Sequence, residues 1–187
     1  MTKEERNHIL KQDIDTQKSK YQKDITDRNG ETQTMKLKSF MLVVKDNERA
    51  RQFYHDLFGL EMLVDNDGNM LLSDGLVLQE ERYWRSFIGR DIVPRNNACE
   101  LYFEEQDVDG FYERLLALYP ETEFVNLPMT HAWGQRVVRF YDPDRHIIEV
   151  GENLKTVCRR FLLSGMTPEE TAVRMDVPLK YVMACMR

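Results

Sequence analysis

The sequence of 187 residues lacks the features of several specialised classes of protein. It has no run of about 18 apolar residues, so we expect no transmembrane helix and no membrane partner. Its first residues, M-T-K-E-E-R-N, lead into a charged segment without the apolar stretch of a secretory signal peptide. These two absences predict a cytoplasmic protein.

Cysteine is scarce and widely spaced. The chain has Cys99, Cys158 and Cys185, and no two of them form a C-x-x-C pair. This spacing favours reduced thiols over a disulfide framework or a zinc site. The formal net charge of −6 gives no reason to expect nonspecific binding of nucleic acid.

A middle segment able to form a core lies between two segments of different character. The hydrophobic fraction of 42% suits a soluble globular protein. Residues 35–153 carry 13 Lys or Arg against 22 Asp or Glu, a net charge of −9, and we expect them to form the main domain. Residues 1–34 are poor in apolar residues and are expected to form a flexible or helical arm. Residues 154–187 carry 6 basic against 3 acidic side chains, a net charge of +3, and show helical patterns.

The first part of the middle segment predicts one strand, one helix and three further strands. Asp46 has the position of a helix cap, and Gly59 that of a helix stop. D-N-D-G and S-D-G predict hairpin-type turns, whereas residues 82–97, with Trp84, are expected to form a loop. The expected elements are a strand at 37–44, a helix at 46–58 and strands at 60–64, 69–73 and 76–81.

The same order of elements then begins again. Asp46 and Asp107, which open the two predicted helices, lie 61 residues apart, and so do Ser39 and Glu100 in the two leading strands. An internal duplication explains this spacing and predicts an α+β fold of two βαβββ modules, with halves at about 35–97 and 98–153. The second set consists of a strand at 98–105, a helix from 107 to before Pro120, and strands near 122–126, 135–141 and 146–150.

Polar side chains alternate with apolar ones in the strands of both halves. In E-L-Y-F-E, the side chains of Glu100, Tyr102 and Glu104 share one face of the strand. Glu149 stands between Ile148 and Val150 and faces away from both. Convergence of these polar positions on one face predicts a lined cavity, whereas the alternative is the wet face of an open antiparallel sheet.

Two longer motifs carry a resemblance to a known superfamily. They are L-V-V-K-D-N-E-R-A-R-Q-F-Y-H-D-L-F-G-L-E (42–61) and W-G-Q-R-V-V-R-F-Y-D-P-D-R-H-I-I-E-V (133–150). Together they resemble the vicinal oxygen chelate superfamily, which includes glyoxalase I, bleomycin-resistance proteins and extradiol dioxygenases. The resemblance covers about residues 36–153 and implies that the two modules form a curled antiparallel cup. The glycine that usually follows D-P-D is Arg145 here, so we expect the turn to take another form.

The resemblance implies four positions that could hold a metal at the base of the cup. They are Ser39, Gln79, Glu100 and Glu149, and the duplication is expected to pair Ser39 with Glu100 and Gln79 with Glu149. Any cofactor is expected to be a divalent cation, Mn²⁺, Mg²⁺ or Ni²⁺, held by Gln79, Glu100 and Glu149, and an oxygen-only set suits the first two better than Ni²⁺. No histidine falls on these positions, which argues against an extradiol dioxygenase.

The function implied by the resemblance is binding of a small organic ligand by a glyoxalase-like protein. A lyase or isomerase acting next to a carbonyl would use Glu149 or Glu100 as its general base. The alternative is a non-catalytic, ligand-sequestering protein of the bleomycin-resistance type, whose cup is often shared by two chains, so a homodimer is expected. The residues expected to bind the ligand are Ser39, Gln79, Tyr102, Trp84 and Trp133.

The C-terminal segment predicts a helix over L-K-T-V-C-R-R-F-L-L, which stops at Ser164-Gly165, and then a helical pair that resembles a helix-turn-helix unit. Thr167-Pro168-Glu169-Glu170 is a strong helix start, and Pro178 separates the next helix. The last helix offers only Lys180 and Arg187 for reading DNA bases, so we expect a packing or dimerisation element that does not bind nucleic acid. A ligand-responsive DNA-binding regulator is the third functional alternative.

Overall fold

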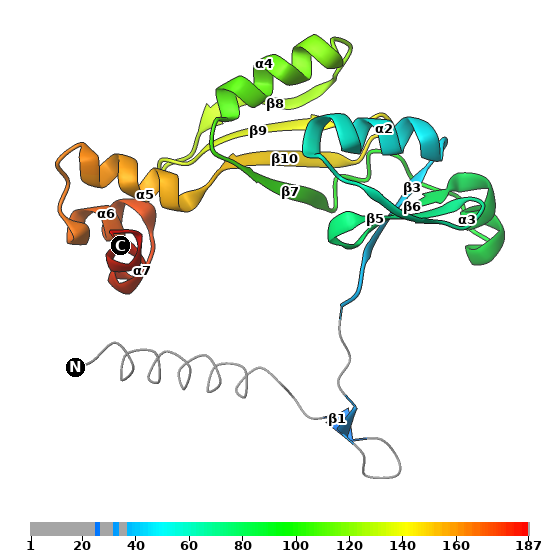
Figure 1. Cartoon of the computed structure of the whole chain (residues 1–187), viewed down its shortest axis with the longest axis horizontal. Helices are drawn as coiled ribbons and strands as arrows, with labels where there is room; N and C mark the ends of the chain where they lie inside the picture. The colour runs from blue at the N-terminus through cyan, green and yellow to red at the C-terminus, as the bar shows by residue number, and fades with distance from the viewer. Residues whose placement is uncertain (1–24, 27–31, 34–36, 187) are drawn as a thin grey trace. The chain divides into compact units, whose positions relative to one another are not determined.

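The computed structural model describes residues 25–26, 32–33 and 37–186 (Figure 1). The chain divides into the compact units Met1–Lys38 and Ser39–Arg187. In the first unit, β1 (Ile25–Thr26) and β2 (Thr32–Gln33) pair antiparallel, and the rest of the predicted arm lies outside the described residues. Every helix among the described residues is too short or too polar to cross a bilayer.

The first half of the main domain is a four-stranded sheet with one helix. The Asp46 side chain accepts a hydrogen bond from the backbone N–H of Arg49 and so caps the helix, which ends at Gly59 in the left-handed conformation. The strand order is β3-β6-β5-β4. The elements are β3 (Phe40–Val44), α2 (Asn47–Phe58), β4 (Met62–Asp65), β5 (Asn69–Leu72), the short 3₁₀ turn η1 (Ser73–Gly75) and β6 (Leu76–Glu80).

The second half repeats this plan, as the predicted duplication requires. Its strand order is β7-β10-β9-β8, and Asp107 caps its helix as Asp46 caps α2. The two βαβββ modules are as predicted, but in each sheet the strand before the helix pairs parallel with the last strand of the module, so the sheets are mixed rather than antiparallel throughout. The elements are β7 (Glu100–Glu105), α4 (Val108–Leu118), β8 (Phe124–Thr130), β9 (Arg136–Tyr141) and β10 (Ile147–Glu152).

Residues 81–88 correct the prediction of a loop at 82–97, because they form the helix α3 (Glu81–Ile88). Arg85 pairs with Glu81 one turn earlier, and Gly89 ends the helix in the left-handed conformation. The ring of Tyr83 lies against Gly68 in the turn between β4 and β5. Packing of this kind stabilises a helix that is too short to form by propensity alone.

The two halves share one hydrophobic core. The ring of Phe58, at the end of α2, stacks on Phe103 of β7 with centroids 3.8 Å apart. Buried residues from both sheets belong to the same cluster, including Leu42 and Val44 from β3 and Ile148 and Val150 from β10. Figure 1 shows α2 and α4 over the strands, and the opposite face of each sheet is therefore the face available to a ligand.

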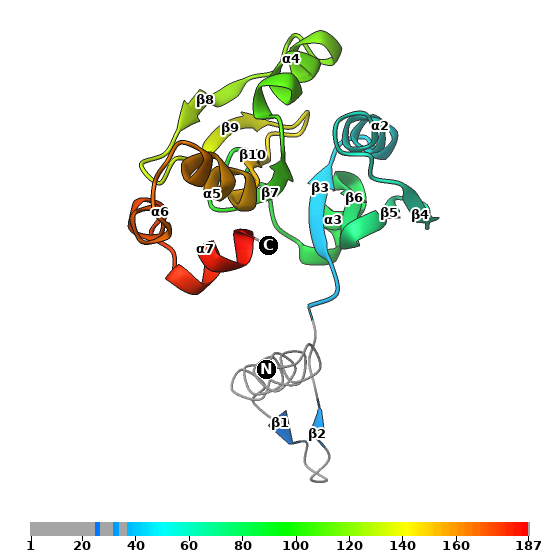
Figure 2. The same cartoon turned by 60° about the vertical axis from the view of Figure 1, so that its left-hand side comes forward.

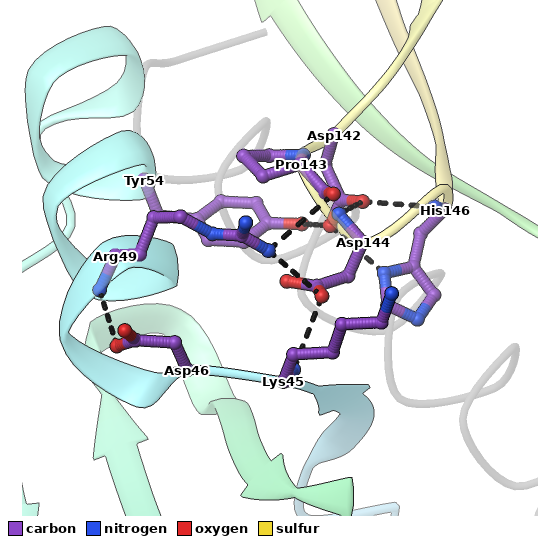
Figure 3. Close-up of polar contacts among 8 residues, drawn as sticks. All are labelled: Lys45, Asp46, Arg49, Tyr54, Asp142, Pro143, Asp144 and His146. Carbon is purple, nitrogen blue, oxygen red and sulfur yellow. Dashed lines mark hydrogen bonds and ion pairs between the residues drawn. The ribbon is translucent and has the colours of Figure 1, made fainter.

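The D-P-D turn between β9 and β10 joins the halves through polar contacts, of which the one between Tyr54 and Asp142 is buried (Figure 3). The hydroxyl of Tyr54 on α2 donates to Asp142 Oδ2 at 2.8 Å. Asp144 Oδ1 accepts hydrogen bonds from the backbone N–H of Lys45 at 3.1 Å and from Arg49 Nη2 at 2.9 Å. The turn that carried the family resemblance is thus also a junction between the two modules.

Arg145 adopts the conformation that a glycine would have in this turn. Its φ is +76°, so the turn keeps the left-handed position, and the prediction that it takes another form is wrong. Such a conformation costs a non-glycine residue about 1–2 kcal/mol. The guanidinium of Arg145 bonds to Glu123 at 2.6 Å, and the turn is further held by Asp142 Oδ1, which accepts from the N–H groups of Asp144 and His146.

Three helices follow the main domain. They are α5 (Leu154–Leu163), α6 (Pro168–Met175) and α7 (Leu179–Cys185), of which α6 and α7 are the predicted pair, and α5 continues directly from β10 (Figure 2). Thr167 and Glu170 form the predicted capping box at the start of α6. The helices enclose a core of their own, formed by Val157, Cys158, Ala172, Met175, Val182 and Cys185.

Candidate functional site

The candidate site lies on the face of the second sheet that points away from its helix, here called the open face. Leu101 and Phe103 pack into the shared core, so the alternating residues of β7 lie on the open face, as predicted. Glu149 lies beside Tyr102 in the parallel pair β7–β10 and opposite Arg139 in the antiparallel pair β9–β10. The polar side chains of the open face are Glu100, Tyr102, Glu104, Arg139 and Glu149.

Arg139 lies between the two predicted catalytic carboxylates. Its guanidinium forms an ion pair with Glu149, and its Nε donates to Glu100 Oε2 at 3.4 Å. Burial raises the pKa of Glu149, which is only 6% exposed; Arg139 opposes this shift and Glu100 adds to it. The structure thus brings Glu100 and Glu149 together, but with a cation already between them.

Gln135 is the centre of a hydrogen-bond network at one end of this face. Its Oε1 accepts from the indole N–H of Trp133 at 2.9 Å, and its Nε2 donates to the Tyr102 hydroxyl at 3.0 Å. The ring of His131 stacks on Trp133, with centroids 4.1 Å apart. A Cβ at Gly151 would lie 2.8 Å from the Tyr102 ring, so glycine allows this ring to lie across β10. The network places three aromatic rings next to the carboxylates.

The candidate residues of the first half have other surroundings. Gln79 is buried and supports its own hairpin, since its Nε2 donates to the Gly68 carbonyl and its Oε1 accepts from Asn69 at 2.8 Å. Ser39 is exposed just before β3, and Trp84 lies on α3. Within the described part of the chain, no hydrogen bond or ion pair joins these three residues to the open face of the second sheet.

Strand register corrects the predicted equivalence of Gln79 and Glu149. The helix caps Asp46 and Asp107 set an offset of 61 residues, which relates Met41 to Tyr102. Met41 pairs with Val77, and Tyr102 pairs with Glu149, so Val77 is the counterpart of Glu149. The first sheet therefore presents an apolar side chain at the position where the second presents its buried carboxylate.

The predicted metal ligands do not fit a divalent cation in this arrangement. The guanidinium of Arg139 already neutralises Glu149 and contacts Glu100, and the amide of Gln79 is used by its own turn. Among residues 37–186, no group of three or more His, Cys, Asp or Glu is arranged to hold a metal ion. The carboxylates of the open face are better placed to accept hydrogen bonds from an organic ligand.

A cavity of about 470 Å³ lies on the other side of the second sheet, between α2 and α4. Its polar groups already have partners, since Asp56 accepts from Tyr119 and Arg114 donates to the Leu57 carbonyl. Of the residues of the open face named above, Glu104 reaches its lining, whereas Glu100, Tyr102, Arg139 and Glu149 do not. The open face therefore remains the better candidate for a ligand site.

Comparison with known proteins identifies the family. Residues 37–155 match the glyoxalase-like domain family. This chain belongs to that family. The match covers both halves of the main domain and ends just inside α5.

The chain is also similar to individual proteins and solved structures. The uncharacterized protein YraH of Bacillus subtilis is 29% identical over 126 residues, which are 62% of this chain and 97% of YraH. A protein of unknown function from Agrobacterium tumefaciens, known from its crystal structure, is 35% identical in sequence. The two structures match with a TM-score of 0.56 over 65% of this chain and 96% of the Agrobacterium chain. A glyoxalase/bleomycin resistance protein/dioxygenase from Nocardioides has the same fold, at 22% identity and a TM-score of 0.52 over 65% of this chain and 85% of its own.

Two residues of the open face were not predicted as site residues. Arg139 was visible in the W-G-Q-R-V-V-R motif, but only the pairing of β9 with β10 shows that it faces Glu149. Gln135 lies in the same motif, next to Gly134, and its buried amide joins Trp133 to Tyr102. A buried amide inside a conspicuous turn motif is the signal that could have identified it.

We expect Glu149→Gln to raise the midpoint of thermal unfolding at neutral pH. Because burial raises the pKa of Glu149 in the folded state, its ionised form costs stability at neutral pH. That cost disappears as the pH falls below the pKa that Glu149 has in the unfolded chain. The difference in unfolding midpoint between variant and parent should therefore shrink on acidification. The exposed Glu113→Gln is the control, and a lower midpoint for Glu149→Gln at neutral pH would contradict the expectation.

Proposed function

We propose that the open face of the second sheet binds a small organic ligand that combines an aromatic ring with a positive charge, and holds it without chemical conversion. The observation that carries the proposal is the juxtaposition of carboxylates and exposed rings. Glu100 and Glu104 are exposed, Tyr102 is 45% exposed and Trp133 is 37% exposed. Aromatic rings attract organic cations, and carboxylates accept hydrogen bonds from them.

The charge of the face favours a cation over an anion. Glu100, Glu104 and Glu149 outnumber Arg139, and Arg139 is already paired with two of these carboxylates. To pair with Arg139, an anionic ligand would have to displace one of these carboxylates. This arrangement supports the ligand-sequestering type of protein, in which a metal-free cup is lined by aromatic and acidic groups.

We further propose that a second copy of the chain completes the cup. The outer strands β4 and β8 are sheet edges and carry exposed apolar side chains, which a soluble protein usually covers. A homodimer would cover them, and native mass spectrometry should then show twice the mass of the chain; a monomer would contradict this. The exposed residues are Met62, Leu63 and Val64 on β4 and Val125, Leu127 and Met129 on β8.

Proton transfer next to a carbonyl is the second candidate function. The raised pKa of buried Glu149 favours it, because a general base works best with a pKa near the working pH. Arg139 opposes it by stabilising the ionised carboxylate. Deuterium exchange into dihydroxyacetone in D₂O distinguishes the two functions: exchange that depends on Glu149 would establish turnover, and its absence is the result we expect.

Binding of three ligands of matched shape tests the proposal. 2-Phenylethylamine is a cation, 2-phenylethanol is neutral and 3-phenylpropanoate is an anion. We expect the order of affinity to be amine, then alcohol, then carboxylate, because the carboxylates of the face attract the first and repel the last. The NMR signal of the indole N–H of Trp133, in a Trp84→Phe background that leaves one tryptophan, should shift and saturate.

Matched variants give this experiment its control. Glu100→Gln should weaken binding of the amine and leave the affinity for the alcohol unchanged. Glu113→Gln, on the exposed side of α4, should change neither. Equal binding of the amine and the carboxylate, or the absence of a saturable shift, would overturn the proposed function.

A further inference from the structure

The three C-terminal helices are an addition to the domain that this chain shares with its relatives. The family match ends at residue 155, and α6 and α7 lie wholly beyond it. Nearly the whole length of YraH, 97%, is matched by only 62% of this chain. A contact between these helices and the open face would therefore give this protein a feature of the ligand site that the shared domain does not supply.

Such a contact exists between α5 and the turn that joins β8 to β9. Arg160 Nη2 donates to the carbonyl of Gly134 at 2.8 Å and to Glu152 Oε2 at 2.6 Å. A Cβ at Gly134 would overlap the ring of Phe161, so the helix lies directly against the turn. Glu152 Oε2 also accepts from the backbone N–H of Arg136, which follows the turn.

The same turn carries the aromatic end of the candidate site. Gly134 stands between Trp133 and Gln135, and Gln135 Nε2 donates to the Glu152 carbonyl at 2.9 Å as well as to the Tyr102 hydroxyl. A shift of Gly134 would therefore move the indole of Trp133 and the amide that holds Tyr102. Arg160 touches the backbone between these two groups.

The helices also approach β7 at this end of the sheet. Asn153, the cap of α5, donates from Nδ2 to Glu104 Oε2 at 2.6 Å. Tyr181 on α7 lies close enough to Glu104 for that carboxylate to contribute to the rise in the pKa of its phenol, which burial mainly causes. Val137 alternates with Arg139 and so lies on the open face, and it is fully buried. The open face is thus closed at this end.

We propose that the C-terminal helices form the end wall of the ligand site and that Arg160 is the residue that positions the turn carrying Trp133 and Gln135. The proposal rests on the proposed function for the identity of the site. Arg160 does not contact the carboxylates of the open face; it acts through the carbonyl of Gly134. The helices would accordingly limit the length of the aromatic cations that the site accepts.

Arg160→Gln in the Trp84→Phe background tests this proposal in the full-length chain. The variant removes the charge that bridges Gly134 and Glu152, so we expect the indole N–H signal of Trp133 to move. Loss of a hydrogen bond to a charged group should weaken binding of 2-phenylethylamine about 5- to 10-fold. Arg160→Lys keeps one donor and the charge, and it should restore part of the affinity.

Arg159→Gln is the matched control. Arg159 precedes Arg160 on α5, but its Nε donates to the Cys185 carbonyl within the helical unit at 3.4 Å. We expect this variant to leave both the Trp133 signal and the affinity unchanged. A general loss of helix stability would affect the two variants alike, whereas positioning of the turn affects only the Arg160 variants.

The outcomes separate this proposal from the proposed function. One outcome is that the parent binds the amine while Arg160→Gln and Arg159→Gln give the same Trp133 signal and the same affinity. In that case the proposal of an end wall is wrong, and the proposed ligand site is unaffected. If the parent does not bind the amine, the proposed function fails, and the Trp133 signal alone decides whether Arg160 positions the turn. A Trp133 signal unmoved by Arg160→Gln overturns the proposal in either case.

Discussion

Replacing Asp142 by alanine should lower the free energy of unfolding by about 3–5 kcal/mol, because the change leaves several buried donors without an acceptor. Asp142 is 2% exposed and lies in the D-P-D turn (Figure 3). It accepts from the Tyr54 hydroxyl and from the backbone N–H groups of Asp144 and His146, and it pairs with His146 Nδ1 at 2.8 Å. Urea denaturation gives the free energy of unfolding directly.

Two further variants make the Asp142 result specific. Asp109→Ala removes an exposed partner of Arg136 and should cost about 1 kcal/mol or less. Tyr54→Phe should cost about 1–2 kcal/mol in the parent, but little in the Asp142→Ala background, where its acceptor is already absent. A loss for Asp142→Ala no larger than for Asp109→Ala would contradict the role of the turn as a junction.

The second large effect is expected at Gly134. Its φ is +88°, a conformation that other residues rarely adopt, and a Cβ there would overlap Phe161. Backbone strain and the clash together should make Gly134→Ala cost about 2–4 kcal/mol. The indole signal of Trp133 should move as well, since the neighbouring backbone must shift.

Gly59→Ala isolates the backbone contribution. Gly59 has a φ of +67°, and among the described residues no atom beyond its chain neighbours lies within 4 Å of a Cβ at that position, so this variant carries strain without a clash. It should cost about 1–2 kcal/mol. Adding Phe161→Leu should restore part of the stability that Gly134→Ala loses. It should restore none of the stability that Gly59→Ala loses. Equal losses for the two glycine variants would show that α5 does not lie against the turn.

Much of the fold could be predicted because its signals are local. Asp46 and Asp107 cap helices of similar length, Gly59 ends the first, and the spacing of 61 residues between the caps indicates the duplication. The helix α3 was missed for a physical reason. Its eight residues are stabilised by packing of Tyr83 against Gly68, a contact between segments that no local pattern reveals.

The site could be predicted only in part, because register decides which side chains meet. Alternation placed Glu100, Tyr102 and Glu149 on one face, as the sheet confirms. The resemblance to the superfamily related Gln79 to Glu149, whereas strand pairing relates Val77 to it. The Arg139–Glu149 ion pair depends on the same pairing, and it occupies a carboxylate that was expected to be a metal ligand.

The most direct test of the ligand site is the position of bound 2-phenylethylamine, measured by intermolecular nuclear Overhauser effects. The open face predicts contacts from the phenyl protons to Trp133 and Tyr102, with the ammonium end near Glu100. The cavity on the helix side of the sheet offers a clear alternative, because Phe58 and Phe103 line it. Contacts to those two rings, and none to Trp133, would contradict the account.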